Sequence, residues 1–373
     1  MPRFATITDE EAREIQAGKD AVRTKKQTEL MSNILLDYIR EKKIVMNLET
    51  ASKQIVNQFL ESFYFEVRKK DGGMYKKTSF FSLRFALQRY FKELRGDDFD
   101  IISNEEFNGA NSRFSAQCVV LKRNGLAKVD HYPPILVEDV RTMYASEVFD
   151  IKSPVGLQRK VFFELMLNFC RRGMENLREL TVHDFELRQL SNGTEVVIKT
   201  SDELTKNHRV DSNIQDEGVM KSTGTENCPV AAYKSYVSKL HPRGKAFFLV
   251  AAPPSGHWYD NMVLGVKSLE KMMKRISVEA KLSYVYTNHS IRSTCITILD
   301  QAGIEARHIM AVSGHTSESS LRTYARTSTE KRNQLSALLS ENTSNLSAKK
   351  PRIDLQQKDP PQQQQHQQQQ RQE

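Results

Sequence analysis

Apolar residues recur every three to four positions along most of the chain, which is the spacing of amphipathic helices. In the N-terminal part, such apolar faces run through 27–39, 51–63 and 79–94. In the C-terminal half they run through 137–146, 157–170, 228–240 and 288–325. The pattern therefore predicts a mainly helical protein with two helical regions.

Two stretches depart from the helical spacing. Residues 186–210 hold an Asn192–Gly193 turn and a β-branched run over 194–200, which together predict short strands in a hairpin. Residues 245–252 are a second strand-like apolar run, whereas 257–265, with the one tryptophan, reads as a loop. The predicted fold class is mainly α with a small antiparallel β-sheet (α+β).

Breaks in the pattern divide the chain into domains. The segment 121–134 (LKRNGLAKVDHYPP) is polar and rich in turn residues, and it predicts a linker. We expect a flexible N-terminal arm at 1–22, a helical domain at 23–120, the linker at 121–134, a second domain at 135–340 and a disordered glutamine-rich tail at 341–373.

The stretch 288–325 holds the most informative side chains. We expect Asn288 to cap a helix, Gly303 and Gly314 to end helices, and the apolar positions between them to face the core. Left over are His289, Arg292, His315 and Tyr324, an unusual set for three short helices. Taken singly, each is explained by a solvated histidine, a surface arginine or a packed tyrosine.

The spacing of these residues points to function. His289 and Arg292 form H-x-x-R, His315 follows 23 residues after Arg292 within G-H, and Tyr324 follows nine residues later. This pattern resembles the C-terminal signature of the tyrosine recombinases, the phage-integrase family. The resemblance implies a recombinase catalytic domain at 135–340 and a helical, DNA-clamping core-binding domain at 23–120.

The resemblance also implies further site residues. The family has its first catalytic arginine after an apolar helix, where Arg172 fits better than Arg171 and Glu175 fits a structural partner of the arginine. A catalytic lysine lies on a hairpin in the family; Lys206 is our candidate and Lys199 the alternative. Alternatively, these are helix-terminal arginines and solvated lysines. The order of motifs, with R-R-G-x-E at 171–175 and C-P-V at 228–230, resembles the eukaryotic Crypton-type transposon recombinases.

For the matched residues the resemblance implies DNA strand transfer. Tyr324 would attack a phosphodiester, Arg172 and Arg292 would bind the non-bridging oxygens, and Lys206 would protonate the leaving 5′ oxygen. His289 would accept the tyrosine proton and His315 would hydrogen-bond the phosphate. The carboxylates have no metal-binding spacing, so we expect metal-independent chemistry without a cofactor.

Charge and composition agree with a polyanionic partner. The chain has 55 basic and 46 acidic residues, a net charge of +9. Four cysteines without a C-x-x-C pair fit a reducing compartment, and no apolar run reaches the length of a membrane span. Residues that would contact DNA, or else be solvated, are Lys77, Arg84, Arg95, Lys122, Arg123 and Lys128.

Three functions are compatible with these residues. The first is an active site-specific recombinase, mobilising a Crypton-like element as a homotetramer on double-stranded DNA. The second is a domesticated, non-catalytic DNA-binding regulator that has kept the fold. The third, a type IB topoisomerase, is disfavoured because Tyr324 follows His315 by only nine positions, which leaves no room for its linker coiled coil. The basic segment 349–352 (KKPR) fits a nuclear-import signal, so we expect a nuclear protein without membrane attachment.

Overall fold

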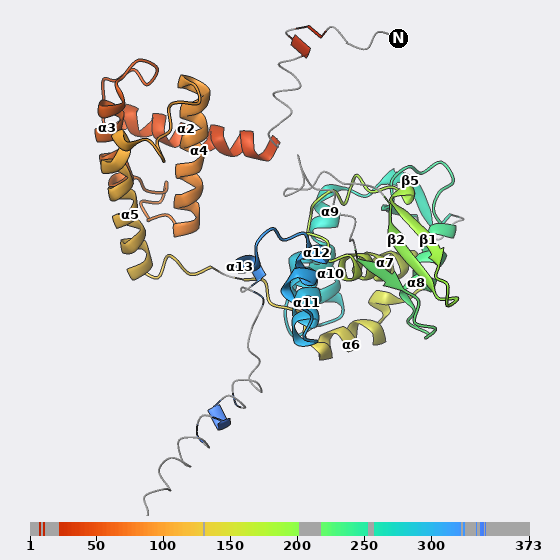
Figure 1. Cartoon of the computed structure of the whole chain (residues 1–373). Coiled ribbons are helices and arrows are strands. Elements are labelled where there is room, and N and C mark those ends of the chain that lie inside the picture. Colours follow the sequence, from red (N-terminus) through yellow and green to blue (C-terminus); the bar gives the residue numbers. More distant parts are fainter. Residues whose placement is uncertain are drawn as a thin grey trace, which may run out of the picture. The chain divides into compact units, whose positions relative to one another are not determined.

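The chain forms two compact units, Met1–Asp130 and His131–Glu373 (Figure 1). We refer to them as unit 1 and unit 2. The computed structural model describes residues 7, 8, 10, 11, 22–129, 131–200, 218–252, 257–321, 324, 333, 336–338 and 340. Most of the predicted arm at 1–22 and the whole predicted tail at 341–373 lie outside this part of the chain.

Unit 1 is helical throughout its described part. Its long helices are α2 (Val22–Glu41), α3 (Lys53–Glu66), α4 (Lys77–Arg95) and α5 (Asn108–Arg123), with a short 3-10 helix η1 (Glu105–Phe107) before α5. Local signals set their ends: the Ser52 side chain accepts a hydrogen bond from the Ile55 amide at the start of α3, and Gly96, with φ of 90°, ends α4. Helix α5 reaches Arg123, three residues into the predicted linker.

Aromatic residues from three helices join in the core of unit 1. The rings of Tyr64 (α3), Phe80 (α4) and Phe114 (α5) lie 4.6 to 5.8 Å apart, centroid to centroid. All three side chains are almost completely buried. Such rings bury large apolar areas and also have favourable edge and stacking contacts. Unit 1 therefore has a hydrophobic core of its own.

Unit 2 is built from helices around α7, with two small sheets. Its helical elements are α6 (Val137–Ala145), η2 (Glu147–Phe149), α7 (Pro154–Asn168), η3 (Val182–Asp184), α8 (Pro229–Ser238), α9 (Val266–Glu270), α10 (Met272–Glu279), α11 (Asn288–Gln301), α12 (Ala306–Ser313) and α13 (Glu318–Leu321). Ser153 caps α7: its side chain accepts from the Gly156 amide, and Pro154 is the first helical residue. Because α7 packs against α8, α10 and α11, it is buried on almost every side.

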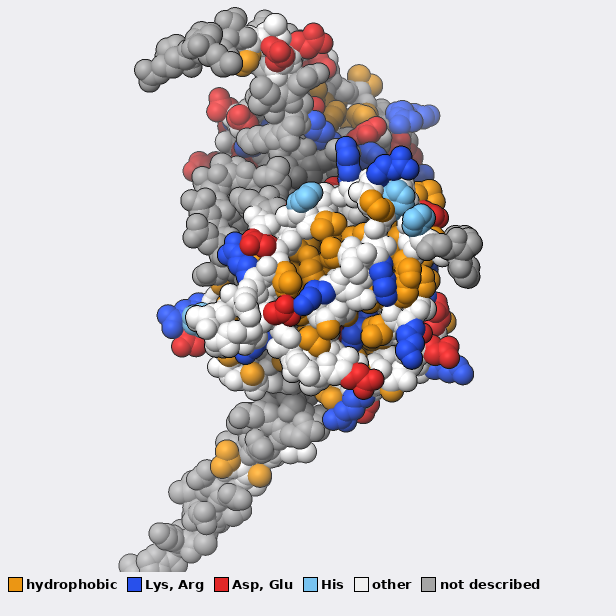
Figure 2. Space-filling model, turned by 90° about the vertical axis from the view of Figure 1, so that its right-hand side faces the viewer, with side chains coloured by type: hydrophobic (Ala, Val, Ile, Leu, Met, Phe, Trp, Pro, Cys, Tyr) orange, Lys and Arg blue, Asp and Glu red, His pale blue; other side chains and the backbone are white. Residues whose placement is uncertain are grey.

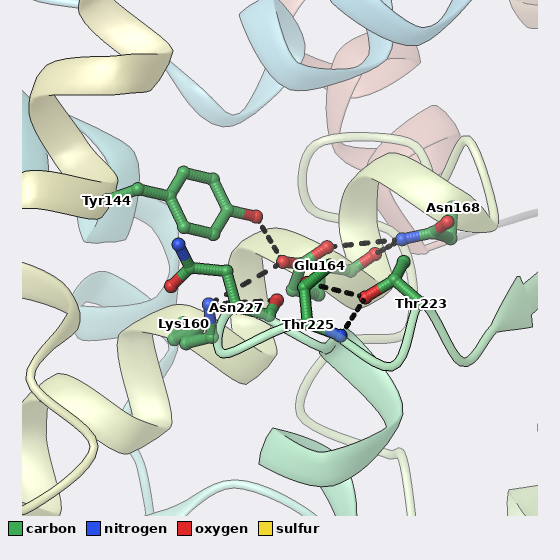
Figure 3. A network of polar contacts seen from close by, with 7 residues as sticks. All are labelled: Tyr144, Lys160, Glu164, Asn168, Thr223, Thr225 and Asn227. Carbon is green, nitrogen blue, oxygen red and sulfur yellow. Dashed lines mark hydrogen bonds and ion pairs between the residues drawn. The ribbon is translucent and has the colours of Figure 1, made fainter.

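Helix α7 carries a buried polar network (Figure 3). The Tyr144 hydroxyl donates to a Glu164 carboxylate oxygen, and Lys160 Nζ lies 4.0 Å from the same oxygen and 4.2 Å from the centre of the Tyr144 ring. Asn168 donates to the backbone and side-chain oxygens of Glu164. Burial lowers the pKa of Lys160 and raises that of Glu164. The two ions therefore depend on each other and on their hydrogen bonds.

The strands form two separate antiparallel sheets. In the first, β1 (Phe185–Gln189), β2 (Glu195–Lys199) and β3 (Val219–Lys221) lie in the order β1-β2-β3, and the predicted hairpin at the Asn192–Gly193 turn is confirmed. In the second, β4 (Leu249–Ala251) pairs with β5 (Tyr259–Val263). The prediction of a loop at 257–265 is therefore wrong: backbone pairing with β4 overrides the low strand propensity of Asp260 and Asn261.

The helices α11, α12 and α13 occupy the stretch that carried the sequence pattern. Gly314, in the left-handed conformation with φ of 64°, ends α12 as predicted, and its amide donates to the Met310 carbonyl. The prediction that Asn288 caps α11 is wrong, because Thr287 occupies the cap position and Asn288 begins the helix. No helix in the described ranges is long and apolar enough to cross a membrane. The observed class, mainly helical with small antiparallel sheets, is the predicted one.

Candidate active site

Arg292 lies at the centre of the candidate site. It projects from α11 and is only 5% exposed. Its Nη1 donates to the Cys170 carbonyl just after α7, and its Nη2 donates to the Ser313 carbonyl at the end of α12. Both contacts are side chain to backbone, so they fix the guanidinium without neutralising its charge. Arg292 thereby links three segments that are far apart in the sequence.

Arg172, from the segment after α7, reaches the turn that Arg292 contacts. The chain leaves α7 through Cys170, which has a φ of 44°, and this turn directs Arg172 toward α12. Arg172 Nη2 donates to the Gly314 carbonyl at 3.2 Å, and Nη1 forms an ion pair with Glu175 at 2.9 Å. The two guanidinium groups are thus bonded to successive carbonyl groups of one turn.

His315 follows that turn and faces both arginines. Its Nδ1 lies 2.7 Å from the Ser313 hydroxyl and 3.3 Å from Arg292 Nη2. Burial, followed by the positive charges of Arg292 and Arg172, lowers the pKa of His315 to about 4. The imidazole is therefore neutral at pH 7.

Tyr324 packs against His315. The two rings meet edge to face, with centroids 5.8 Å apart, and the Tyr324 amide donates to the Leu321 carbonyl at 2.8 Å. The phenol is partly buried against a small apolar cluster that includes Cys170, Cys295, Ile296, Ile309 and Leu321. This cluster joins the end of α7 to α11, α12 and α13, and Tyr324 packs against it.

His289 lies one turn before Arg292 on α11. Its ring stacks on the exposed Tyr132 ring, with centroids 4.8 Å apart and planes 18° from parallel. Gly173 lies close to the same ring: a Cβ added at Gly173 would be 3.0 Å from ring atoms of His289. Burial and the Arg292 charge lower the pKa of His289. A glycine beside Arg172 thus makes room for this imidazole.

Asn288 holds the start of α11 against the Arg172 segment. Its Nδ2 donates to the Gly173 carbonyl at 2.8 Å and the Leu269 carbonyl at 2.9 Å, while its Oδ1 accepts from the Met273 amide at 3.1 Å. The sequence analysis assigned this residue to helix capping. An asparagine next to a candidate site histidine was the available signal, but its distant partners are not visible in the sequence.

The remaining predicted site residues fall elsewhere. Lys206 lies outside the described residues, and Lys199 ends β2, where it pairs with Phe185. Lys122, Arg123 and Lys128 are exposed on unit 1, and Lys77 is partly buried, 5.8 Å above the Phe81 ring.

Arg84 and Arg95, which the sequence suggested contact DNA or are solvated, bond to neighbouring segments of unit 1. Arg84 donates to Asn111 at 2.6 Å and lies over the Phe114 ring, while Arg95 donates to the Leu48 and Ala51 carbonyl groups. Gln88, on the same helix, is buried and accepts from the Ile101 amide. Helix α5 and the segments before α3 and after α4 therefore pack against this side of α4.

A comparison with family models decides the identity of the fold. The model of the phage integrase family matches residues 141–331, just over half of the chain, and this range contains Arg172, His289, Arg292, His315 and Tyr324. The chain belongs to the phage integrase family.

Other comparisons give more distant relatives. The human "uncharacterized protein KIAA1958" and its mouse homolog are each 24% identical over 241 residues, which is 61% of this chain. The chain spans about a third of the length of these relatives, 33%. A crystal structure of the XerH site-specific recombinase with a palindromic difH substrate is similar in fold, with a TM-score of 0.51 and 15% identity over 84% of this chain and 79% of that one.

The structure brings most of the predicted catalytic residues together. Of the six catalytic residues predicted from sequence, Arg172, Arg292, His315 and Tyr324 form one contact group, and His289 adjoins it on α11. Sequence reasoning missed Ser313, Asn288 and Tyr132, which contact this group. No distinctive spacing marks these three residues, so only the structure reveals them.

Proposed function

We propose that this phage integrase family member cuts and rejoins double-stranded DNA through a covalent 3′-phosphotyrosyl intermediate at Tyr324. One observation carries the proposal: two guanidinium groups and a neutral imidazole meet at the turn Ser313–His315, and the Tyr324 ring packs against that imidazole. Cleavage of a phosphodiester requires positive charge and hydrogen-bond donors at the phosphate and a nucleophile beside them.

The arginines supply charge that is fixed in advance. An arginine has five N–H donors, and the contacts among described residues occupy only some of them on Arg172 and Arg292. Among the described residues that bond to these two arginines, Glu175 is the carboxylate partner, so one negative charge faces two positive ones. Donors that are already oriented stabilise developing charge without reorganisation, by roughly 3–4 kcal/mol for each donor.

Strand cleavage would transfer the phosphoryl group from the 5′ oxygen to Tyr324. The Tyr324 oxygen attacks phosphorus, the bond from phosphorus to the 5′ oxygen breaks, and the bond energy is kept in the tyrosyl ester for rejoining. The phenolic proton goes to His289, whose lowered pKa keeps it neutral and able to accept at pH 7. Lys206 gives a proton to the leaving 5′ oxygen, a role assigned by sequence alone.

Covalent trapping tests this function. Purified protein would be mixed, in a buffer with a metal chelator, with duplex fragments of the source genome that carry single-strand nicks, because a nick lets the leaving strand diffuse away. We expect an adduct that survives SDS, and sequencing of its DNA would identify the recombination site. The Tyr324→Phe protein should form at least a hundredfold less adduct, since it has no nucleophile.

Tyr284→Phe is the matched control, because Tyr284 is an exposed tyrosine of the same unit, 57% accessible. Loss of the adduct in Tyr324→Phe but not in Tyr284→Phe supports the proposal. An adduct that survives in Tyr324→Phe shows that another residue is the nucleophile. DNA binding without an adduct on any fragment supports instead the domesticated, non-catalytic DNA-binding regulator.

We further propose a setting for this activity. The motif order in 171–230 resembles Crypton-type recombinases, and the KKPR segment at 349–352 resembles a nuclear-import signal. We therefore propose that the protein acts in the nucleus on the ends of a Crypton-like element, as a tetramer that holds two duplexes. Mass photometry of the protein on its trapped site tests the assembly: a particle with one or two subunits contradicts it. Diffuse localisation of a fluorescent fusion, unchanged by Lys349→Ala and Lys350→Ala, contradicts nuclear import.

A further inference from the structure

Ser313 contacts both His315 and Arg292, and the sequence pattern gave it no role. It ends α12 and is 4% exposed. Its carbonyl accepts from Arg292 Nη2, and its hydroxyl lies 2.7 Å from His315 Nδ1. One residue therefore fixes the central guanidinium through its backbone and the adjacent imidazole through its side chain.

The contacts around Nδ1 show which nitrogen of the neutral ring carries the proton. Arg292 Nη2, which is a donor only, lies 3.3 Å from Nδ1 and 3.5 Å from Nε2, so it faces both nitrogens and does not select between them. The Ser313 hydroxyl contacts Nδ1, 2.7 Å away, and the direction of this hydrogen bond sets the tautomer.

The surroundings of the Ser313 hydroxyl show that it is the donor in this hydrogen bond, which leaves the ring proton on Nε2. In the described part of the chain, His315 is its only hydrogen-bond partner. If Nδ1 carried the proton, Ser313 would accept it, and its own buried O–H would have no acceptor among these residues. Leaving a buried donor unpaired is costly, so the arrangement in which Ser313 donates is the stable one.

We propose that Ser313 is a positioning residue that holds His315 in the Nε2–H tautomer, so that His315 donates a hydrogen bond to the phosphate and does not act as a base. The hydrogen bond from His315 to the phosphate rests on the proposed function, but the tautomer itself is a property of the free protein. It also separates the two histidines of the site: His289 accepts a proton, and His315 donates a hydrogen bond.

Nitrogen-15 NMR of histidine-labelled protein tests the tautomer without DNA. Long-range correlations between ring protons and nitrogens distinguish Nε2–H from Nδ1–H, and His315→Gln identifies the signals among the nine histidines. We expect Nε2–H for His315 in the wild type at pH 7, and mixed tautomers in Ser313→Ala. An Nδ1–H ring in the wild type, or an unchanged Nε2–H ring in Ser313→Ala, overturns the proposal.

Adduct formation tests the consequence. On nicked DNA in single turnover, we expect Ser313→Ala to react about tenfold more slowly, because one hydrogen bond is lost, with unchanged DNA affinity. Ser313→Thr keeps the hydroxyl and should restore both the tautomer and the rate. A wild type that forms no adduct contradicts the proposed function but leaves the NMR result decisive for Ser313. If Ser313→Ala alters the tautomers but leaves the rate of adduct formation unchanged, His315 does not act as a hydrogen-bond donor in catalysis.

Discussion

At the scale of single residues, the site depends on a histidine that is held neutral. Burial of His315, followed by the positive charges of Arg292 and Arg172, lowers its pKa from 6.5 to about 4. A neutral ring can donate and accept at the same time, whereas a protonated ring would repel both guanidinium groups. Protonation of His315 is therefore expected to disrupt the very turn that holds the arginines together.

This shift predicts a pH dependence of stability. Because the folded-state pKa of about 4 is below the unfolded value of 6.5, the unfolded chain takes up a proton first as the pH falls. The free energy of unfolding should fall between about pH 6.5 and pH 4, by roughly 2 kcal/mol more in the wild type than in His315→Gln. Urea unfolding at pH 7 and pH 4.5, followed by the fluorescence of Trp258 in unit 2, measures it.

His308→Gln is the control for this measurement, because His308 is an exposed histidine on α12. It should follow the pH dependence of the wild type. If His315→Gln also follows the wild type, His315 does not contribute the expected difference in proton binding.

At the scale of elements, periodicity predicted which helices exist, and spacing predicted which side chains meet. The apolar positions of α7 and α11 identified both as core helices, and Gly314 was recognised as the end of α12. Contacts with distant segments were beyond such patterns. Asn288 is of a residue type that often caps helices, but its side chain bonds to Gly173 and Leu269. Arg95 stands where the pattern favours a surface residue, but its side chain bonds to Leu48 and Ala51.

The buried network of α7 supports a prediction about stability. Replacing Lys160 by Met leaves the Glu164 carboxyl buried without its cationic partner, so we expect the free energy of unfolding to fall by about 3 kcal/mol. Adding Glu164→Gln removes the unpaired charge and should recover most of that loss. Urea unfolding of the wild type and the two variants measures both effects. A double variant no more stable than Lys160→Met would show that packing, not charge, governs this part of α7.

At the scale of the whole molecule, positive charge is unevenly divided along the sequence. Residues 22–129 contain 20 basic and 13 acidic residues, whereas 131–340 contain 27 and 23. Figure 2, which views the side where Figure 1 has β1 and β5, shows basic and acidic side chains mixed around exposed apolar ones. The helical part of unit 1, residues 22–129, therefore has a net charge of +7 (20 − 13), against +4 (27 − 23) for residues 131–340, and such an excess attracts a DNA backbone.

The last turn of α5 offers a direct test of that attraction. Lys122 and Arg123 are exposed, so changing both to Ala should leave the melting temperature unchanged and weaken DNA binding. Each lost phosphate contact should reduce the slope of log affinity against log salt by about 0.9. Fluorescence anisotropy between about 50 and 200 mM salt measures that slope.

A second pair of substitutions shows whether position or net charge matters. Lys25 and Lys26 on α2 are also exposed, and changing both to Ala removes the same charge from unit 1. We expect a smaller change of the slope from this pair, because the sequence marks Lys122 and Arg123, and not Lys25 and Lys26, as candidates for DNA contact. Equal changes from both pairs would mean that DNA responds to the total charge of unit 1. Arg95→Ala should instead destabilise unit 1, by roughly 1–3 kcal/mol, since two carbonyl groups lose their donor.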